Sequence, residues 1–382
     1  MTPVVAESPV DPGGLAEFSV VFTGRALNHM SRNFQQVMRD ISALMRSVYQ
    51  ADAVAVVPGG GSYGMEAIAR QFAQDARVLV IRNGWFSYRW SQIFAMGRIV
   101  AHETVLKARR VSDAPQSPFA PPPIEEVEAA IARDKPELVF AAHVETASGI
   151  ILPDDYLDRV GAAVHAHGGL FVLDCVASGA IWVDMRARGI DVLLSAPQKT
   201  WSAPSSSALV MLGARAAHRL EQTQSTSFAA DLRKWRQIMQ AYENGSHAYH
   251  ATMPTDALRH FRDAAQQTVS LGLDHLRERQ EMLGRKVRTL LVEHGYPSVA
   301  ASGFEAPGVV VSYTRDPDLA SAKRFVELGI QAAAGVPLMC DEPADFRSFR
   351  IGLFGLDKFA DVDATVERLA QALRALAGSG AR

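Results

Sequence analysis

Short apolar runs alternate with segments of helical periodicity through the first half of the chain. The apolar runs span residues 53–57, 77–81, 138–142, 170–173 and 192–194, and the helical segments span residues 65–73, 124–132 and 153–165. Strands that are buried on both faces of a parallel sheet read as continuous apolar runs, and a helix between two of them supplies the crossover that a parallel pair needs. We therefore predict an α/β fold with a mostly parallel central sheet between helices, and a surface loop at the proline-rich stretch 115–123.

The pattern changes after about residue 260. A helical segment at 271–294 is followed by a strand-like run at 308–313, and apolar residues spaced by three and four positions run from Val362 to Leu376. Such spacing is typical of an amphipathic helix with one buried face. A chain of 382 residues is long enough for about two domains of ordinary size. We predict a large α/β domain over residues 29–260 and a smaller C-terminal α+β domain over residues 261–382.

Composition excludes several classes of function. The chain has 39 lysines and arginines against 41 acidic residues, so no excess of positive charge is available for a nucleic acid. Its two cysteines, Cys175 and Cys340, are too few for a disulfide framework or a cysteine metal cluster. It has neither a signal-peptide core nor an apolar run of the roughly 20 residues that span a bilayer. We expect a cytoplasmic protein with no nucleic-acid, membrane or metal partner.

The pair Asp174 and Lys199 is the most informative chemical feature. Asp174 directly follows the run 170–173, and Lys199 comes shortly after the run 192–194. Open α/β sheets bind their ligands at the carboxyl ends of the strands. One reason for both groups there is pyridoxal phosphate, because lysine forms a Schiff base with its aldehyde and an ionised aspartate keeps its pyridine nitrogen protonated. The plainer interpretations are an ion pair at the sheet edge or two unrelated solvated side chains.

A glycine-rich segment at residues 58–66 follows the first apolar run and precedes a helical segment. It reads Pro-Gly-Gly-Gly-Ser-Tyr-Gly-Met-Glu, so backbone amides at a helix N-terminus could hold a phosphate group. It lacks the Gly-Lys-Ser/Thr ending of a Walker loop and the third glycine of a dinucleotide fingerprint. The alternative is a tight turn that needs glycine for its backbone alone. Residues 143–149 close the third run with short hydroxyl side chains that could reach a bound ring.

Five short motifs occur in the order and at the separations of a known family. They are Asn83-Gly-Trp-Phe86, His143-x-Glu-Thr-x-Ser-Gly149, Asp174-x-Val-x-Ser178, Ser195-x-x-Gln-Lys199 and Arg350-Ile-Gly352. In this combination the chain resembles the class V aminotransferases among the fold type I pyridoxal-phosphate enzymes. The resemblance extends from about His29 to the C-terminus and is strongest to the alanine–glyoxylate and serine–glyoxylate aminotransferase group. It implies a fold type I transferase.

The resemblance implies a role for each matching residue. Lys199 would form the Schiff base and transfer the proton, and Asp174 would bind the pyridine nitrogen. Val176 and Phe86 would cover the two faces of the ring. The implied phosphate ligands are Gly61, Ser62 and Gln198, and Thr146 would lie near the ring hydroxyl.

The resemblance also implies how substrate and subunits are arranged. Arg350 would bind the substrate carboxylate, a role that suits the planar fork of arginine. Tyr249 and Thr252 match residues with which this group reaches the cofactor phosphate of the neighbouring subunit. A two-fold homodimer with shared active sites is therefore implied, and residues 1–28 would lie near the active site or the dimer interface.

The implied activity is the transfer of an amino group. A small amino acid of the alanine, serine or aspartate type would give its amino group to a 2-oxo acid such as glyoxylate or pyruvate. The two half-reactions would follow each other in a ping-pong mechanism.

The N-terminal segment departs from the family, whose members usually begin with Gly-Pro-Gly-Pro close to the substrate. Here the chain reads Asp11-Pro-Gly-Gly14. Arg25 is a candidate for a second carboxylate contact that would select a dicarboxylic substrate, and the alternative is a plain surface arginine.

Other functions remain as alternatives. Cys340 lies ten residues before Arg350, which keeps open a class V cysteine desulfurase, although Asp341 and Glu342 beside it would oppose thiolate formation. A cofactor-binding regulator on the same fold would be expected to carry an added DNA-binding domain. A nicotinamide-dependent dehydrogenase is opposed by the missing dinucleotide fingerprint.

Overall fold

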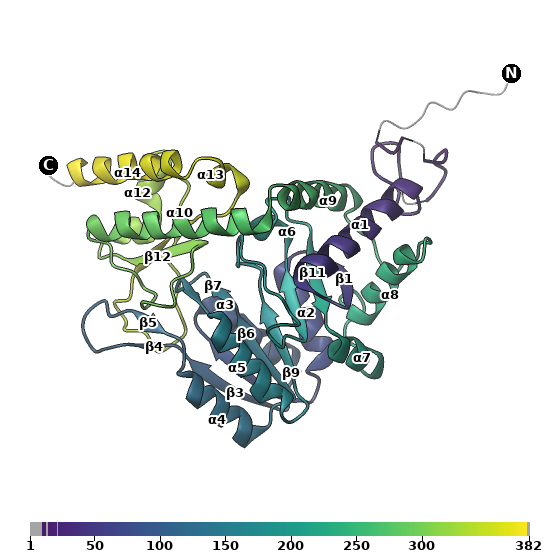
Figure 1. Ribbon diagram of the computed structural model, residues 1–382, viewed down its shortest axis with the longest axis horizontal. Coiled ribbons are helices and arrows are strands. Elements are labelled where there is room, and N and C mark those ends of the chain that lie inside the picture. The colour runs from purple at the N-terminus through teal and green to yellow at the C-terminus, as the bar shows by residue number, and fades with distance from the viewer. Residues whose placement is uncertain (1–9, 13, 21, 380–382) are drawn as a thin grey trace.

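The computed structural model describes residues 10–12, 14–20 and 22–379, so part of the predicted segment 1–28 lies outside the described residues. At the centre is a seven-stranded sheet of order β1-β11-β10-β9-β6-β2-β3 (Figure 1). Its strands are β1 (Ala53–Pro58), β2 (Arg77–Arg82), β3 (His102–Lys107), β6 (Leu138–Ala142), β9 (Leu170–Asp174), β10 (Val192–Ser195) and β11 (Ser207–Leu212). All neighbouring pairs from β10 to β3 are parallel, whereas β11 is antiparallel to both β10 and β1. The predicted mostly parallel α/β sheet is confirmed.

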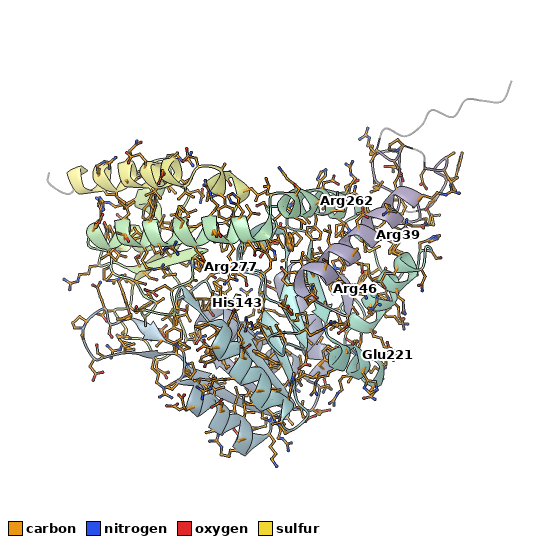
Figure 2. The ribbon with its side chains drawn as sticks, viewed as in Figure 1. Arg39, Arg46, His143, Glu221, Arg262 and Arg277 are labelled. Atoms are coloured by element: carbon orange, nitrogen blue, oxygen red, sulfur yellow. The ribbon has the colours of Figure 1, made fainter. Side chains whose placement is uncertain are left out.

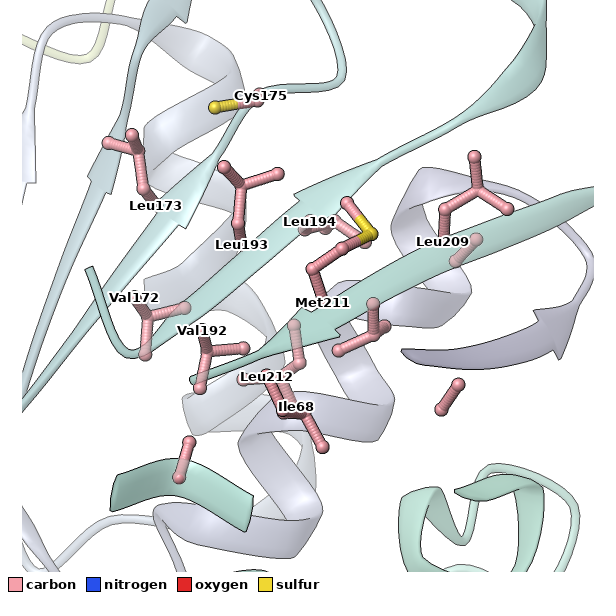
Figure 3. Packing of buried hydrophobic residues seen from close by; sticks show 14 of the residues in the cluster. Ile68, Val172, Leu173, Cys175, Val192, Leu193, Leu194, Leu209, Met211 and Leu212 are labelled. Atoms are coloured by element: carbon pink, nitrogen blue, oxygen red, sulfur yellow. The ribbon is translucent and has the colours of Figure 1, made fainter. Parts of the chain in front are cut away.

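The sheet is held together by strands that are apolar on both faces. Leu173, Leu193 and Met211 lie opposite one another on β9, β10 and β11, and all three are completely buried. Figure 3 shows this row packing beside Leu194. Full burial of one such side chain contributes about 1.5–3 kcal/mol relative to an exposed position. The packing of these side chains therefore fixes the positions of β9 and β10, and with them the carboxyl ends of both strands.

Helices flank the sheet, and several of them pack directly onto its strands. They are α1 (Arg32–Tyr49), α2 (Gly61–Phe72), α3 (Trp85–Gly97), α4 (Ile124–Asp134), α5 (Asp154–His165), α6 (Pro197–Thr200), α7 (Ala214–Gln222), α8 (Leu232–Glu243) and α9 (Thr255–Ser270). The closest approach is that of α2, where a Cβ atom added to Gly64 would lie 2.5 Å from side-chain atoms of both Ala208 and Leu194. Glycine at this position lets α2 pack tightly against β10 and β11.

The C-terminal part forms a second, antiparallel sheet of order β12-β14-β13. Its strands are β12 (Val309–Tyr313), β13 (Ala333–Ala334) and β14 (Ser348–Gly352), and its helices are α10 (Leu273–Glu293), α11 (Pro317–Ala320), α12 (Lys323–Glu327), α13 (Leu356–Ala360) and α14 (Val362–Ser379). Figure 1 shows α10 and α14 side by side above this sheet. The division predicted at residue 260 falls within α9, whose Leu258 and Phe261 belong to the core of the large sheet. The packing therefore favours a division at Gly272, between α9 and α10.

Two short hairpins lie between the sheets. β4 (Arg109–Arg110) pairs with β5 (Phe119–Ala120), and β7 (Val144–Glu145) pairs with β8 (Ile150–Ile151). The stretch 115–123, predicted as a surface loop, is instead partly buried, because Phe119 packs in a cluster with Val144 and Val311. In addition, the Tyr313 hydroxyl donates to the Ser117 carbonyl at 2.7 Å. The prolines of this stretch indicated a loop correctly, but one aromatic side chain anchors it in the core.

Two features are absent from the described residues. No helix in residues 10–12, 14–20 and 22–379 is long and apolar enough to cross a membrane. Over the same ranges, no group of three or more histidine, cysteine, aspartate or glutamate side chains could hold a metal ion. The cytoplasmic location stays a prediction.

Candidate active site

A cavity of about 120 Å³ lies at the carboxyl edge of the large sheet. It is lined by Gly61, Ser62, Met65, Phe86, Arg89, Val144, Thr146, Asp174, Val176, Ala177, Gln198 and Lys199. Eight of these were predicted as site residues, and they come from five separate stretches of sequence. A larger groove of about 520 Å³ lies at the opposite edge of the sheet, but its lysine, Lys135, is exposed. The small cavity therefore holds the chemical groups that the sequence singled out.

Asp174 is the last residue of β9, and its carboxylate is almost completely buried. The backbone N–H of Val176 donates to Asp174 Oδ1 at 2.9 Å. Burial raises the pKa of Asp174 to about 6, although the Val176 N–H and the positive charge of Lys199 oppose the rise. The carboxylate is thus ionised at neutral pH, inside an environment that makes ionisation costly.

Lys199 lies on the short helix α6, which follows β10 directly. Its Nζ is 5.7 Å from the ring centre of Phe86 and 5.8 Å from that of Phe354. Burial lowers the pKa of Lys199, and Arg350 lowers it further, whereas Asp174 and Glu145 act in the opposite direction. A lysine with a lowered pKa carries more of its amine in the neutral form, which is the form that attacks a carbonyl carbon.

The glycine-rich segment forms the start of α2. Gly61 and Ser62 lie in its first turn, so the helix begins four residues earlier than predicted, and no side chain caps it. A Cβ atom added to Gly61 would lie 2.8 Å from Val176 Cγ2, so glycine allows this helix end to approach the loop after β9. An uncapped helix N-terminus presents backbone N–H groups and a partial positive charge to the cavity.

Glu145 connects two of the sequence motifs. Its carboxylate is completely buried and accepts hydrogen bonds from the backbone N–H groups of Phe86, Ser87 and Ala147 at 3.2, 2.8 and 3.0 Å. It therefore caps the first turn of α3, the helix that carries Phe86. A Cβ atom added to Gly84 would lie 2.6 Å from Glu145 Cγ, which explains the glycine of the Asn83-Gly-Trp-Phe86 motif.

A buried hydrogen bond holds the loop after β9. His143 Nδ1 lies 2.7 Å from Ser178 Oγ, and both residues are 1 % exposed. Burial, with a smaller effect of Arg277 on α10, lowers the pKa of His143 to about 3, so the ring is neutral at physiological pH. Figure 2 shows His143 and Arg277 at the junction between α10 and the large sheet. The bond restrains the loop that carries Asp174 and Val176.

Arg350 projects from β14 of the small sheet. Its Nε donates to the Ala334 carbonyl at 2.7 Å, and its Cζ lies 5.7 Å from the ring centre of Phe86. Bonding through Nε fixes the plane of the guanidinium group. No hydrogen bond from its two terminal nitrogens is present in the described part of the chain. These nitrogens can therefore donate two hydrogen bonds to one carboxylate.

Arg350 is not among the residues that line the cavity, and neither are four others considered from the sequence. Tyr249 is 58 % exposed, and its hydroxyl lies 3.4 Å from Thr252 Oγ1. Arg25 is exposed on the N-terminal segment. Cys340 is buried, its thiol donates to the Arg82 carbonyl at 3.3 Å, and burial raises its pKa to about 12. A thiol held in this way is a poor nucleophile, which counts against the desulfurase alternative.

Two charged residues of the site received no role from the sequence. Glu145 lay within a recognised motif but had no assigned contact. Arg89 lines the cavity and was not singled out. The available signal was its spacing, because Arg89 follows Phe86 by three positions and so shares its helix face.

Residues 18–310 match the family described as Aminotransferase class-V. The chain belongs to the class-V aminotransferase family. The predicted resemblance and the predicted enzyme class, a transaminase, are both confirmed.

This class-V aminotransferase is similar to curated relatives over most of their length. It is 26 % identical over 371 residues to alanine–glyoxylate aminotransferase of Mus musculus, covering 92 % of the chain and 82 % of the relative. It is 28 % identical over 340 residues to 2-aminoethylphosphonate–pyruvate transaminase of Paraburkholderia phymatum, covering 86 % and 84 %. The crystal structure of alanine–glyoxylate aminotransferase from Nostoc sp. matches with a TM-score of 0.76 at 22 % identity, covering 91 % and 89 %. The predicted fold type I architecture is thereby confirmed.

Proposed function

We propose that this class-V aminotransferase binds pyridoxal phosphate and transfers the amino group of a small amino acid to a 2-oxo acid such as glyoxylate or pyruvate. The observation that carries the proposal is the convergence of Lys199 and Asp174, two buried groups of opposite charge, in one cavity at the strand ends. The acceptors follow from the names of the relatives, which contain glyoxylate or pyruvate. The donor belongs to the alanine, serine or aspartate type.

The donor set of the cavity fits this cofactor. A buried lysine amine suits its aldehyde, and a buried carboxylate suits its ring nitrogen. The hydroxyl of Thr146 is buried and has no hydrogen-bond partner among the described residues, so it can pair with the ring hydroxyl. The uncapped start of α2 at Gly61 and Ser62 suits the phosphate group, with Gln198 close by.

The side chains of this chain divide the work of the reaction. When bound, the cofactor supplies a carbonyl carbon for the substrate amine and a ring that accepts electrons. Asp174 would keep the ring nitrogen protonated, and the Lys199 amine would take the proton from the substrate α-carbon as the general base. Arg350 binds the substrate carboxylate and so orients the α-carbon toward Lys199. Phe86 and Val176 enclose the ring and exclude water from its faces.

The same proposal includes a two-fold homodimer. Within one chain, Tyr249 and Thr252 do not reach the cavity, although they correspond to phosphate ligands in the family. The aromatic rings of Phe22, His29 and Tyr249 lie in one cluster, which joins the N-terminal segment to this loop. A second copy that buries this surface would bring Tyr249 and Thr252 to the phosphate of the partner.

A donor-by-acceptor activity matrix tests the proposed function. The purified enzyme with added cofactor is assayed with alanine, serine, aspartate and 2-aminoethylphosphonate as donors, against glyoxylate and pyruvate as acceptors. We expect at least one pair to turn over with the parallel double-reciprocal lines of ping-pong kinetics, and we expect Lys199→Ala to be inactive. If every pair is inactive, or if Lys199→Ala retains turnover, the proposal is wrong.

A further inference from the structure

Arg89 places a positive charge beside the start of α2. It lies on α3 one turn after Phe86, and its Nη1 donates to Ser62 Oγ at 2.7 Å. Its Cζ is 5.1 Å from the ring centre of Phe86. Arg89 also lines the cavity together with Lys199 and Asp174. The side chain is therefore directed from α3 across the cavity to the first turn of α2.

The start of α2 offers hydrogen-bond donors that have no acceptor. No side chain caps the helix, and in the described part of the chain the backbone N–H groups of Gly61 and Ser62 pair with no acceptor. Arg89 meets no carboxylate within 4.0 Å among the described residues, whereas Arg70 on α2 pairs with Glu66 at 2.7 Å. Two backbone donors, the Ser62 hydroxyl and a guanidinium without a carboxylate partner among the described residues thus lie together at the start of α2.

The charged groups around Lys199 carry an excess of positive charge. The groups that act electrostatically on Lys199 are Asp174, Arg350, Glu145 and Arg89. Counted with Lys199, they give three positive charges against two negative charges. The phosphate ligands predicted from the sequence are all neutral side chains or backbone groups, so they cannot balance a phosphate dianion.

We propose that Arg89 is the cation that binds the phosphate group of the cofactor, a role that rests on the proposed function. In this arrangement Ser62 Oγ accepts from Arg89 and directs its own hydroxyl hydrogen toward a phosphate oxygen. Arg89 forms a charge-assisted hydrogen bond to the same phosphate. Its position over Phe86 also couples the phosphate end of the site to the aromatic ring that covers the cofactor.

The test compares the affinity of the apoenzyme for two compounds that differ only in the phosphate. Pyridoxal phosphate and pyridoxal are titrated against wild type, Arg89→Gln, Arg89→Lys and the control Arg70→Gln, and binding is followed by absorbance and by equilibrium dialysis. We expect Arg89→Gln to weaken pyridoxal phosphate about 10- to 100-fold and pyridoxal less than about threefold. Arg89→Lys should recover part of the loss, because it keeps the charge without the fork. Arg70→Gln should behave as wild type.

A second measurement uses inorganic phosphate as the probe and needs no cofactor. Phosphate should raise the melting temperature of wild-type apoenzyme and of Arg70→Gln, but not that of Arg89→Gln. If Arg89→Gln folds poorly, Arg89→Lys replaces it, and the rise in melting temperature that phosphate causes in Arg89→Lys should be smaller than in wild type. An equal rise in wild type and Arg89→Lys, with Arg89→Gln unfolded, would contradict a role for the arginine fork.

Three results would overturn the inference about Arg89. They are an equal loss of affinity for both compounds in Arg89→Gln, an unchanged affinity for pyridoxal phosphate, and a raised KM for a dicarboxylic donor without any change in cofactor affinity. The last result would assign Arg89 to the substrate. If wild type binds neither compound, the proposed function itself fails, and the inference falls with it. The two failures are therefore distinguishable.

Discussion

At the scale of single residues, Asp174 and Lys199 occupy positions that work against their charged forms. Burial is the largest cause in both cases, since it raises the pKa of Asp174 to about 6 and lowers the pKa of Lys199. Groups with shifted pKa values cluster at functional sites because catalysis needs them there. A protein that only had to fold would gain stability by replacing such a pair with apolar side chains.

The first prediction concerns the pH dependence of stability. A carboxyl group whose pKa is higher in the folded protein than in the unfolded chain binds its proton more tightly when folded. Its favourable contribution is present below the unfolded pKa of 3.8 and is lost as the pH rises through about 6. Relative to Asp174→Asn, the aspartate protein should therefore lose about 2 kcal/mol of unfolding free energy between pH 4 and pH 7.

Urea unfolding of the apoprotein measures this loss. Both proteins are prepared in a Lys199→Ala background, so that titration of the lysine does not contribute to the comparison. A difference between them that stays constant from pH 4 to pH 7, or that moves in favour of the aspartate, would contradict the account of a buried, destabilised carboxylate.

The sequence predicted most of the cavity but not its charge balance. Lys199, Asp174, Phe86, Thr146 and the start of α2 were identified because each ends an apolar run or belongs to a recognisable motif. Arg89 was missed because its importance depends on two helices, α2 and α3, bringing their first turns together. No spacing along the chain predicts that approach.

At the scale of elements, the Asn83-Gly-Trp-Phe86 and His143-x-Glu motifs form one structural unit. Glu145, from the β7 strand, caps α3 and sets the position of Phe86 over the cavity. Gly84 leaves the space that the Glu145 side chain occupies. The position of Phe86, the aromatic residue of the cavity wall, is thus set by Glu145, which does not itself line the cavity.

Glu145→Gln tests this unit. Its amide nitrogen would face backbone N–H groups that need an acceptor, so we expect a loss of about 1–3 kcal/mol in unfolding free energy. Because Phe86 would also lose its fixed position, the affinity for pyridoxal should fall as much as the affinity for pyridoxal phosphate. Thermal unfolding and cofactor titration measure the two effects. If Glu145→Gln has the same unfolding free energy as wild type, the hydrogen bonds of Glu145 do not stabilise α3.

The elements that the sequence did not predict share weak or mixed patterns. β3 is an edge strand that starts at the exposed His102 and continues with half-buried residues that include Glu103 and Lys107, so it shows no apolar run. α3 combines aromatic residues with serines, which obscured its period. β11 is fully buried and follows a serine-rich stretch, and its antiparallel direction depends on the tertiary fold. Local patterns predicted β1, β2, β6, β9 and β10 because each of these strands is a continuous apolar run that is buried on both faces.

At the scale of the whole molecule, one chain exposes apolar side chains where a second copy is proposed to bind. Leu15, Phe18 and Val20 of the N-terminal segment are 95 %, 94 % and 102 % exposed. Large apolar side chains that are exposed together are typical of interaction surfaces. The adjoining loop carries Tyr249 and Thr252, so the proposed interface and the proposed shared sites are continuous.

Mixing two damaged enzymes tests whether sites are shared. Lys199→Ala and Tyr249→Ala are each expected to have low activity at limiting cofactor. After dissociation and random reassociation, half of the dimers are hybrids, and one of the two sites in each hybrid has both native residues. The mixture should regain about a quarter of wild-type activity. A mixture that stays as inactive as its components would indicate that Tyr249 serves its own chain or no site at all.

The central claim is that Lys199 is the residue to which the cofactor attaches. The most direct measurement is borohydride reduction of the enzyme loaded with pyridoxal phosphate, followed by digestion and mass spectrometry of the peptides. The account predicts a visible absorbance band that disappears on reduction and a single modified peptide that carries the cofactor on Lys199. Modification of a different lysine, or an unmodified Lys199 in protein that has bound the cofactor, would contradict it.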